Sequence, residues 1–410
     1  MKVKKVLIIG HIWSEPNSSA SGSRLLQIID LFQDQKCELI FVSAALKSEF
    51  SFDLNLLGIK SYQIELNSSV FDDFFKRQNP EIVLFDRFMT EEQFGWKVRE
   101  ICPHAITILD TEDIHFLRLA RQKAHKEQRK FQIKDLYNEI SKREIASILR
   151  CDLTLIISEF EMELLTNEFH INSEILFYLP FIIKKFSEKT NPFEERNDFS
   201  FIGNFFHEPN IQAVLYLKEK IWPLIRKNLK DVQVNIYGSY MPQKISNLHN
   251  EKEKFLVRGR VEDASEVFKL SRVFLAPLLF GAGQKGKLFE AMIYGLPSVT
   301  TSIGAESMHG NLPWNGFISD DEMEFSNCAI DLYLNKKQWN LSQKNGFEIL
   351  KNRFLKKMYA EKFYDVIDYI SINLEHHRNQ NFFGEILKQN AFNTTKYMSK
   401  WIEEKNKSNG

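Results

Sequence analysis

The stretch RVFLAPLLFGAGQKGKLFEAMIYGLPSVTTS, residues 272–302, contains a strand, a loop, a helix and a second strand in succession. Residues 272–279 are an apolar run of strand length, and residues 286–295 have the spacing of a helix. Residues 297–302 are the second short strand-like run. Two strands joined through a helix are typical of a parallel sheet, so this unit predicts an α/β fold.

The same alternation extends through the rest of the chain. Continuous apolar runs are typical of parallel strands that are buried on both faces. They lie at residues 3–10, 37–44, 81–88, 105–110 and 152–158, and again at 199–204, 232–239, 255–261, 272–279 and 297–302. Helical patterns separate them, and residues 115–150 predict one long helix or two shorter ones. We therefore expect an α/β protein with two Rossmann-like domains that face each other across a cleft.

A polar segment with one proline, residues 186–198, is the expected linker. It separates an N-terminal Rossmann-like domain over residues 1–185 from a C-terminal one over residues 199–355. Residues 356–410 predict C-terminal helices, which could cross back to the N-terminal domain, and a tail. The stretch from residue 381 fits either a helix packed on its own protein or an amphipathic helix at a membrane surface.

Composition excludes several classes of protein. The 410 residues include 54 Lys and Arg against 54 Asp and Glu, so no basic excess points to nucleic acid. The four cysteines are far apart, which argues against a zinc site or a disulfide framework. No run is long and apolar enough for a membrane span, and the first is too short for a signal peptide. We expect a cytoplasmic protein, with peripheral contact at the inner face of a membrane as an open alternative.

The loop inside residues 272–302 has the chemistry of an anion site. Three glycines let its backbone approach a ligand closely: Gly281, Gly283 and Gly286. The helix start offers amides to an anion, and Lys285 and Lys287 add positive charge. Glu290 follows in the first or second turn, where a carboxylate can accept hydrogen bonds from both hydroxyls of a ribose. The alternative is an ordinary loop and a glutamate that favours the helix dipole.

These residues resemble the retaining glycosyltransferases of family 4, the glycosyl transferases group 1 set, which adopt the GT-B fold. One subset reads F-G-A-G-x-K-G-K-x-x-E-A-x-x-x-G-L-P-V-V-T-T, and residues 280–301 match it almost letter for letter. The family's E-x7-E pattern places its second acid at Glu290 and its first at Ala282, so the first carboxylate is missing here. The resemblance implies transfer of a sugar, of hexosyltransferase type, from a nucleotide-diphosphate donor to an acceptor hydroxyl with retention.

Further segments agree with the same resemblance. FIGNFFHEPN, from residue 201, resembles the first strand, loop and helix of the donor domain, and VRGRVED, residues 257–263, resembles the loop that cradles the base. Relatives carry basic residues in the first of these loops; this chain does not, so Lys285 is expected to contact the diphosphate. The implied donor site comprises Gly203, Asn204, His207, Gly238, Arg260, Val261, Gly281, Ala282, Gly283, Gln284, Lys285, Gly286, Lys287 and Glu290.

The N-terminal half supplies the acceptor side. DTEDIHFLRLAR follows a strand and resembles the subset's D-x-x-D-x-H-x-x-R segment. An imidazole at a strand end can bind a sugar hydroxyl or move a proton, although a lone histidine is often only structural. The expected acceptor residues are Gly22, Arg24, Asp113 and His115, and the expected catalytic residues are His115, Lys285 and Glu290. A cap on the helix near Gly22 is the alternative use of its neighbouring serines.

The implied partners are a nucleotide-diphosphate sugar and a glycan, lipid-linked or protein acceptor, in surface polysaccharide or glycoconjugate biosynthesis. No metal cluster is readable, and GT-B enzymes generally need neither a metal nor another cofactor. Two alternatives remain: a catalytically degenerate GT-B protein that binds partners, and a nucleotide-sugar epimerase of similar shape. A dehydrogenase is disfavoured because no G-x-G-x-x-G follows the first strand.

Overall fold

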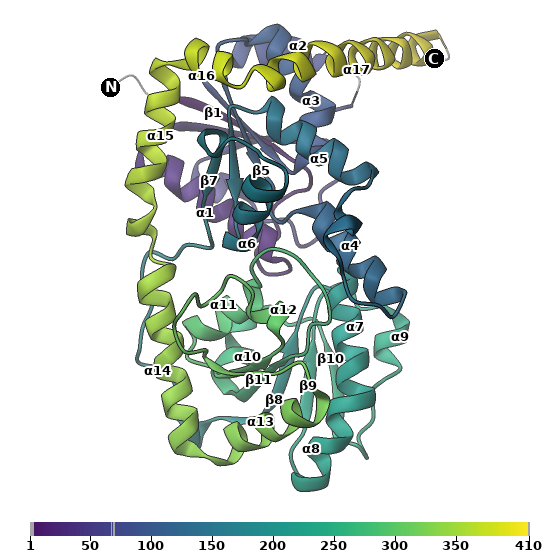
Figure 1. The fold of residues 1–410 in the computed structure, drawn as a ribbon, viewed down its shortest axis with the longest axis vertical. Helices are drawn as coiled ribbons and strands as arrows, with labels where there is room; N and C mark the ends of the chain where they lie inside the picture. The colour runs from purple at the N-terminus through teal and green to yellow at the C-terminus, as the bar shows by residue number, and fades with distance from the viewer. Residues whose placement is uncertain (1–3, 67, 69, 409–410) are drawn as a thin grey trace.

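The computed structural model describes residues 4–66, 68 and 70–408, which form two α/β units, one above the other (Figure 1). The first unit has a seven-stranded parallel sheet in the order β3-β2-β1-β4-β5-β6-β7. Its strands are β1 (Lys5–Gly10), β2 (Glu38–Ser43), β3 (Lys60–Gln63), β4 (Ile82–Asp86), β5 (Ile106–Asp110), β6 (Leu153–Ile156) and β7 (Leu176–Tyr178). A parallel sheet must be covered on both faces, which requires helices between its strands.

Successive residues of the central strand β1 enter opposite halves of the first core. Val6 and Ile8 join one hydrophobic cluster, whereas Leu7 and Ile9 join the other. Helix α1 (Ala20–Asp34) covers the first cluster. The second is covered by α2 (Val70–Gln78), α3 (Phe88–Ile101), α4 (His115–Lys126) and α5 (Glu139–Arg150), with α6 (Glu159–Glu163) nearby. Burial on both sides explains why these strands are apolar throughout.

The second unit repeats this plan with six parallel strands in the order β10-β9-β8-β11-β12-β13. Its strands are β8 (Asn197–Ile202), β9 (Val234–Tyr237), β10 (Phe255–Gly259), β11 (Ser271–Ala276), β12 (Ser298–Thr300) and β13 (Gly316–Ile318). The helices are α7 (Glu208–Tyr216), α8 (Trp222–Asn228), α9 (Gln243–Ser246), α10 (Ala264–Leu270), α11 (Gly286–Ile293), α12 (Ser302–Ala305) and α13 (Glu322–Leu334). The unit quoted at the outset is β11-α11-β12.

The C-terminal helices run along both units (Figure 1). Helix α14 (Lys336–Arg353) packs on the second unit, whereas α15 (Ala360–Ile372) packs on the first. At the crossing, the amide of Ile183 donates to the Phe354 carbonyl at 2.8 Å, so the chain's two passages between the units lie together. Beyond them lie α16 (Leu374–Gln380) and α17 (Phe382–Ser408).

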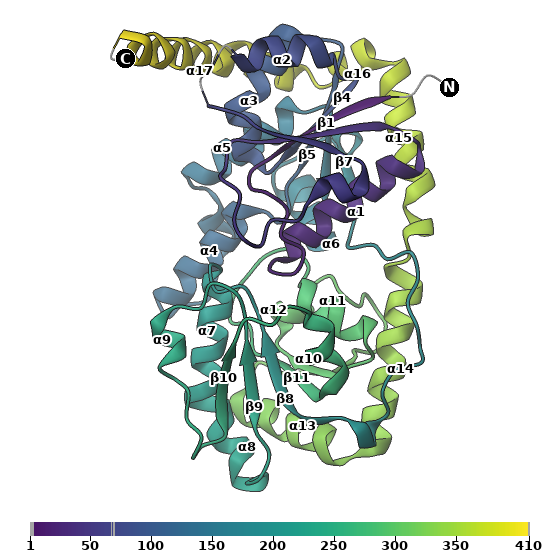
Figure 2. The same cartoon turned by 180° about the vertical axis from the view of Figure 1, so that it is seen from behind.

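Helix α17 packs against α3 and α5 of the first unit (Figure 2). Phe383 and Trp401 on the same helix are nevertheless 75% and 63% exposed. Within residues 4–66, 68 and 70–408, no helix is both long and apolar enough to cross a bilayer. The exposed aromatic residues leave open the alternative of a surface contact.

The expected fold class is confirmed: the chain has two Rossmann-like parallel sheets. The predicted runs correspond to ten of the strands, and residues 115–150 form α4, a short 3-10 turn and α5. Three strands escaped prediction, β3, β7 and β13, and each lies at the edge of its sheet. These three strands have only three or four residues, too few for the apolar run that marks a buried strand, whereas the fourth edge strand, β10, was predicted. Strand β8 begins at Asn197, inside the segment expected to be the linker.

Candidate functional site

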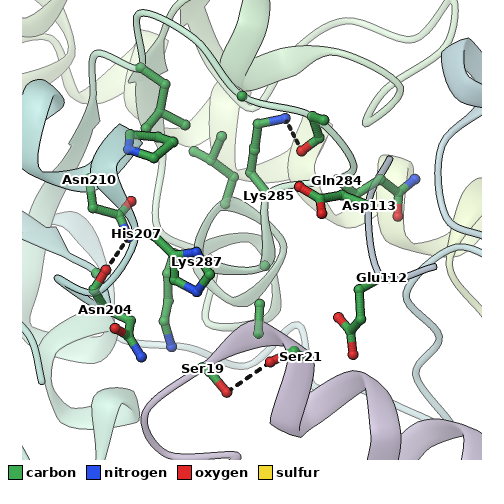
Figure 3. Close-up of a pocket in the computed structure, with 18 of the residues that line it drawn as sticks. Ser19, Ser21, Glu112, Asp113, Asn204, His207, Asn210, Gln284, Lys285 and Lys287 are labelled. Atoms are coloured by element: carbon green, nitrogen blue, oxygen red, sulfur yellow. Dashed lines mark hydrogen bonds between the residues drawn. The ribbon is translucent and has the colours of Figure 1, made fainter. Parts of the chain in front are cut away.

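A cavity of about 210 Å³ lies between the two units, where the carboxyl ends of their strands face each other. In doubly wound proteins this edge of the sheet is the usual place for a ligand. The residues of the first unit that line this cavity are Ser18, Ser19, Ala20, Ser21, Arg87, Glu112, Asp113, His115, Arg118, Ile157 and Phe181. From the second unit come residues 201–204, His207, Pro209, Asn210, Phe274, Ala276, Leu278, 280–282 and 284–288. Figure 3 shows the polar residues converging on this space.

Among the helices that begin at the cavity, α1 and α11 have open first amides. In α11, the amides of Leu288 and Phe289 bond to the Lys285 carbonyl at 2.9 and 3.1 Å. Those of Gly286 and Lys287 have no hydrogen-bond partner among the contacts of the described chain. The amides of Ala20 and Ser21, at the start of α1, are likewise without one in the described chain. Open amides at a helix start favour an anion, and here two starts share one cavity.

Both lysines of the glycine-rich loop line the cavity, but their ammonium groups are used differently. Lys285 turns back and donates to the carbonyls of Ala282 at 3.1 Å and Gly283 at 2.5 Å. Burial lowers the pKa of Lys285 from its ordinary value. Lys287 reaches both oxygens of Glu290 at 3.1 Å, one turn along α11. A ligand anion would therefore compete with backbone carbonyls for Lys285 and with a carboxylate for Lys287.

The first unit holds the glycine-rich loop of the second in place. Arg121 donates to the Gly281 carbonyl at 2.8 Å and is ion-paired with Glu306 at 2.7 Å. The Gly283 amide donates to Glu161 at 2.8 Å, and burial together with Asp113 raises the pKa of that carboxyl to about 8. These bonds cross from one unit to the other, so the loop's conformation depends on how the units meet.

Gly283 and Gly286 have a steric reason to be glycine. Gly283 has φ of +63°, and a Cβ there would lie 2.8 Å from the Cβ of Asp113. A Cβ on Gly286 would lie 2.5 Å from the Cβ of Ala20, at the start of α1. The two helix starts can approach this closely only while position 286 has no side chain.

His115 and Asp113 face the same cavity from the start of α4. Burial alone would raise the pKa of Asp113, but Arg118 and His115 lower it to about 2. The Asp113 carboxylate pairs with the guanidinium of Arg118 at 2.5 Å. On the opposite wall, burial and Arg118 lower the pKa of His207 to about 4, so its imidazole is neutral near pH 7. The cavity thus combines a fixed ion pair with two imidazoles, which can bind hydroxyls.

Glu112 and Arg87 also line the cavity, although neither was among the expected site residues. Burial raises the pKa of Glu112 well above its usual range, and Asp110 and Asp86 act in the same direction. Both residues follow strand ends and have positive φ, 64° for Glu112 and 71° for Arg87. Their position just after β4 and β5 is the sequence signal that could have placed them at the site. Their positive φ could not be predicted from residue type.

The structure brings most of the expected residues together. Those that line the cavity are Gly203, Asn204, His207, Gly281, Ala282, Gln284, Lys285, Gly286, Lys287, Asp113 and His115. Outside the lining lie Gly238, Arg260, Val261, Gly283, Glu290 and Gly22. Gly283 and Glu290 still contact the site, through Glu161 and Lys287 respectively. The guanidinium of Arg260, which was expected at the donor site, lies over Phe50, 4.1 Å from its ring centroid.

The acceptor role expected for Arg24 is wrong. Its side chain is 1% exposed, pairs with Asp110 at 2.7 Å and donates to the Leu179 carbonyl at 2.8 Å. Those bonds join α1 to two strand ends, which makes Arg24 part of the core. Gly22 has a packing role as well, because a Cβ there would lie 2.5 Å from the backbone of Glu15. The sequence alone did not show which residues near the start of α1 face the cavity and which, like Arg24 and Gly22, are used in packing.

Comparison with known proteins agrees with this geometry. Residues 196–335, which include β8 to β13, match the family described as glycosyl transferases group 1. A curated relative from Klebsiella pneumoniae, an uncharacterized 44.6 kDa protein in the cps region, is 25% identical over 171 residues. That match covers 40% of this chain and spans only 44% of the relative.

Solved structures share the fold over almost the whole chain. A glycosyltransferase from Rickettsia africae has a TM-score of 0.66 at 12% identity, covering 90% of this chain and 99% of its own. The pneumococcal O-GlcNAc transferase GtfA, solved with UDP and GlcNAc, has a TM-score of 0.67 at 12% identity over the same shares. HepE from Anabaena, solved with UDP and glucose, has a TM-score of 0.66 at 12% identity over 88% and 99%. At these identities the likeness establishes the two-domain GT-B architecture alone.

Proposed function

We propose that this chain transfers a sugar from a nucleotide-diphosphate donor to an acceptor hydroxyl, because residues 196–335 match the glycosyl transferases group 1 family and the chain has a GT-B fold. One observation carries the proposal: the starts of α1 and α11 meet at the cavity with open amides, beside Lys285 and Lys287. Two helix dipoles and two ammonium groups suit a diphosphate, whose charge grows as it leaves the sugar.

In this proposal the donor lies along the second unit. The diphosphate bonds to the amides of Gly286 and Lys287, and the ammonium of Lys287 moves from Glu290 to a phosphate oxygen. The freed carboxylate of Glu290 then accepts hydrogen bonds from the ribose hydroxyls. UDP in the solved structures of GtfA and HepE supports a nucleoside diphosphate as the leaving group.

The acceptor enters between the units, on the side of His115 and Glu112. An imidazole and a carboxyl of raised pKa can both bind a hydroxyl in a closed cavity. We propose retention at the anomeric carbon, as in the family that the sequence resembles. The K. pneumoniae relative in a cps region supports a surface polysaccharide as the product.

The second candidate is a GT-B protein that binds a donor without transferring its sugar, and Ala282 favours it. This position lacks the family's first acid, and the side chain is 7% exposed, packed in the hydrophobic cluster of the first unit. No carboxylate at position 282 is available to hold the sugar. Both candidate functions predict that the protein binds a nucleotide sugar, but only the first predicts that the donor is cleaved.

The test is a panel of nucleotide sugars, scored by thermal stabilisation and by release of nucleoside diphosphate. Transfer predicts that at least one donor is both bound and cleaved, and that Lys285→Ala and Glu290→Ala each reduce turnover or affinity at least tenfold, about 1.4 kcal/mol. Binding without cleavage in the presence of acceptor extracts would favour the second candidate. Unchanged kinetics in both variants would remove these residues from the site.

A further inference from the structure

The first amides of α4 are bonded to two buried glutamates that come from other helices. Glu144 of α5 is 0% exposed and accepts from the amides of His115 and Phe116, each at 3.0 Å. Glu161 of α6, also 0% exposed, accepts from the amide of Ile114 at 3.0 Å. The amides at this helix start are therefore already paired, in contrast to those at the start of α11.

Glu144 also faces the imidazole of His115. The Nδ1 atom of His115 lies 3.1 Å from the Asp113 carbonyl oxygen and 3.3 Å from Oε1 of Glu144. A carbonyl oxygen can only accept, and so can a carboxylate, so Nδ1 must carry the hydrogen. In a neutral ring this leaves a lone pair on Nε2, the other nitrogen of a side chain that lines the cavity.

We propose that Glu144 is a positioning residue, which fixes His115 as the Nδ1–H tautomer so that Nε2 accepts a hydrogen bond from a sugar hydroxyl. The kinetic consequence rests on the proposed function, whereas the tautomer does not. The Phe88 ring makes a T-shaped contact with the imidazole, 5.4 Å between centroids, and restricts its rotation further.

Capping alone does not require this arrangement. The cap residue of α4 is Ile114, whose side chain makes no capping hydrogen bond. A local serine or aspartate at that position would cap the helix without burying a charge. Glu144 of α5 contacts both the first amides of α4 and the imidazole of His115. A capping side chain at position 114 would need to contact the amides alone. Glu161 serves as the matched comparison, because it caps the same helix without touching the ring.

The first experiment reads the tautomer in the unsubstituted protein. Long-range 15N–1H spectra at pH 8, with His115 assigned from its absence in His115→Asn, should show a protonated Nδ1 and an unprotonated Nε2. In Glu144→Gln the Nε2–H form should become detectable, and in Glu161→Gln it should not. A protonated Nε2 in the unsubstituted protein would overturn the proposal, and so would a tautomer ratio that Glu144→Gln leaves unchanged.

The second experiment is a double-mutant cycle on nucleoside diphosphate release from a donor that the panel identifies. Glu144→Gln should lower kcat about 10–100-fold with the donor KM within about twofold. In the His115→Ala background the same change should cost less than about twofold, because its effect passes through the imidazole. An equal loss in both backgrounds would make Glu144 merely structural. If the unsubstituted protein cleaves no donor, the proposed function fails, and the spectra alone decide the role of Glu144.

Discussion

The starts of α4 and α11 are the same local feature put to opposite uses. Both follow strand ends, and both lie at the cavity between the units. The first amides of α4 are bonded to Glu144 and Glu161, which are wholly buried. The described contacts leave the first two amides of α11 open, with a lysine on either side of Gly286.

The difference teaches how to recognise a binding site among helix starts. The buried Glu144 carboxylate fills the same electrostatic need as a ligand anion, and Glu161 accepts one more amide hydrogen bond, so α4 is complete without a ligand. Helix α11 lacks such partners for its first amides; Lys285 donates to carbonyls of its own loop, and Lys287 pairs with Glu290. The open start is therefore the site that we propose for a diphosphate, whereas the bonded start of α4 holds His115 in place.

The strongest test of the comparison adds one methyl group to the open start. Gly286→Ala would place a Cβ 2.5 Å from that of Ala20, so α1 and α11 must move apart. We expect nucleoside diphosphate release to fall about 100-fold, since displaced amides no longer meet the transition state. Gly281→Ala is the control, because its Cβ meets Lys285 at an ordinary 3.5 Å. An equal loss in the two variants would contradict the role given to the contact between the helices.

A smaller effect is expected from the cation of α11. Lys287→Met should weaken nucleoside diphosphate binding about tenfold, roughly 1.4 kcal/mol, measured by calorimetry. Lys351→Met is the matched control, because Lys351 pairs with Glu348 at the same i,i+3 spacing on α14, outside the cavity. If both variants bind alike, the charge of Lys287 plays no part in holding the diphosphate.

The third prediction concerns the start of α4 and its dependence on pH. Because the folded pKa of Glu161 is raised to about 8 from 4.5, this carboxyl stabilises the fold fully below pH 4.5 and loses that contribution as pH rises through 8. Glutamine does not titrate, so Glu161→Gln should gain about 4 °C or more in Tm relative to the unsubstituted protein between pH 5 and 9.

Glu163→Gln, an exposed position on the same helix, should show no such gain. Calorimetric scans of the three proteins across this pH range provide the comparison. Parallel curves for Glu161→Gln and the unsubstituted protein would mean that the carboxyl does not titrate in this window.

The sequence predicted the open start far better than the closed one. Glycines and lysines at residues 281–287 are local signals, and their chemistry is visible without a fold. The partners of α4 come from positions 29 and 47 residues away, so no local pattern connects Glu144 or Glu161 with it. The acceptor role predicted for Arg24 was wrong for the same reason, because its partner Asp110 is 86 residues away in the sequence. Strands buried on both faces were recognisable as apolar runs, whereas three of the four edge strands, β3, β7 and β13, were not.

The central claim is that α11 offers its first amides to a diphosphate and α4 does not. The most direct measurement is a titration of the 15N-labelled protein with UDP, ADP and GDP, followed at the backbone amides. We predict that at least one nucleotide shifts Gly286 and Lys287 downfield while Ile114, His115 and Phe116 keep their positions. Saturable binding that leaves Gly286 and Lys287 unmoved, or that moves only the amides of α4, would contradict the account.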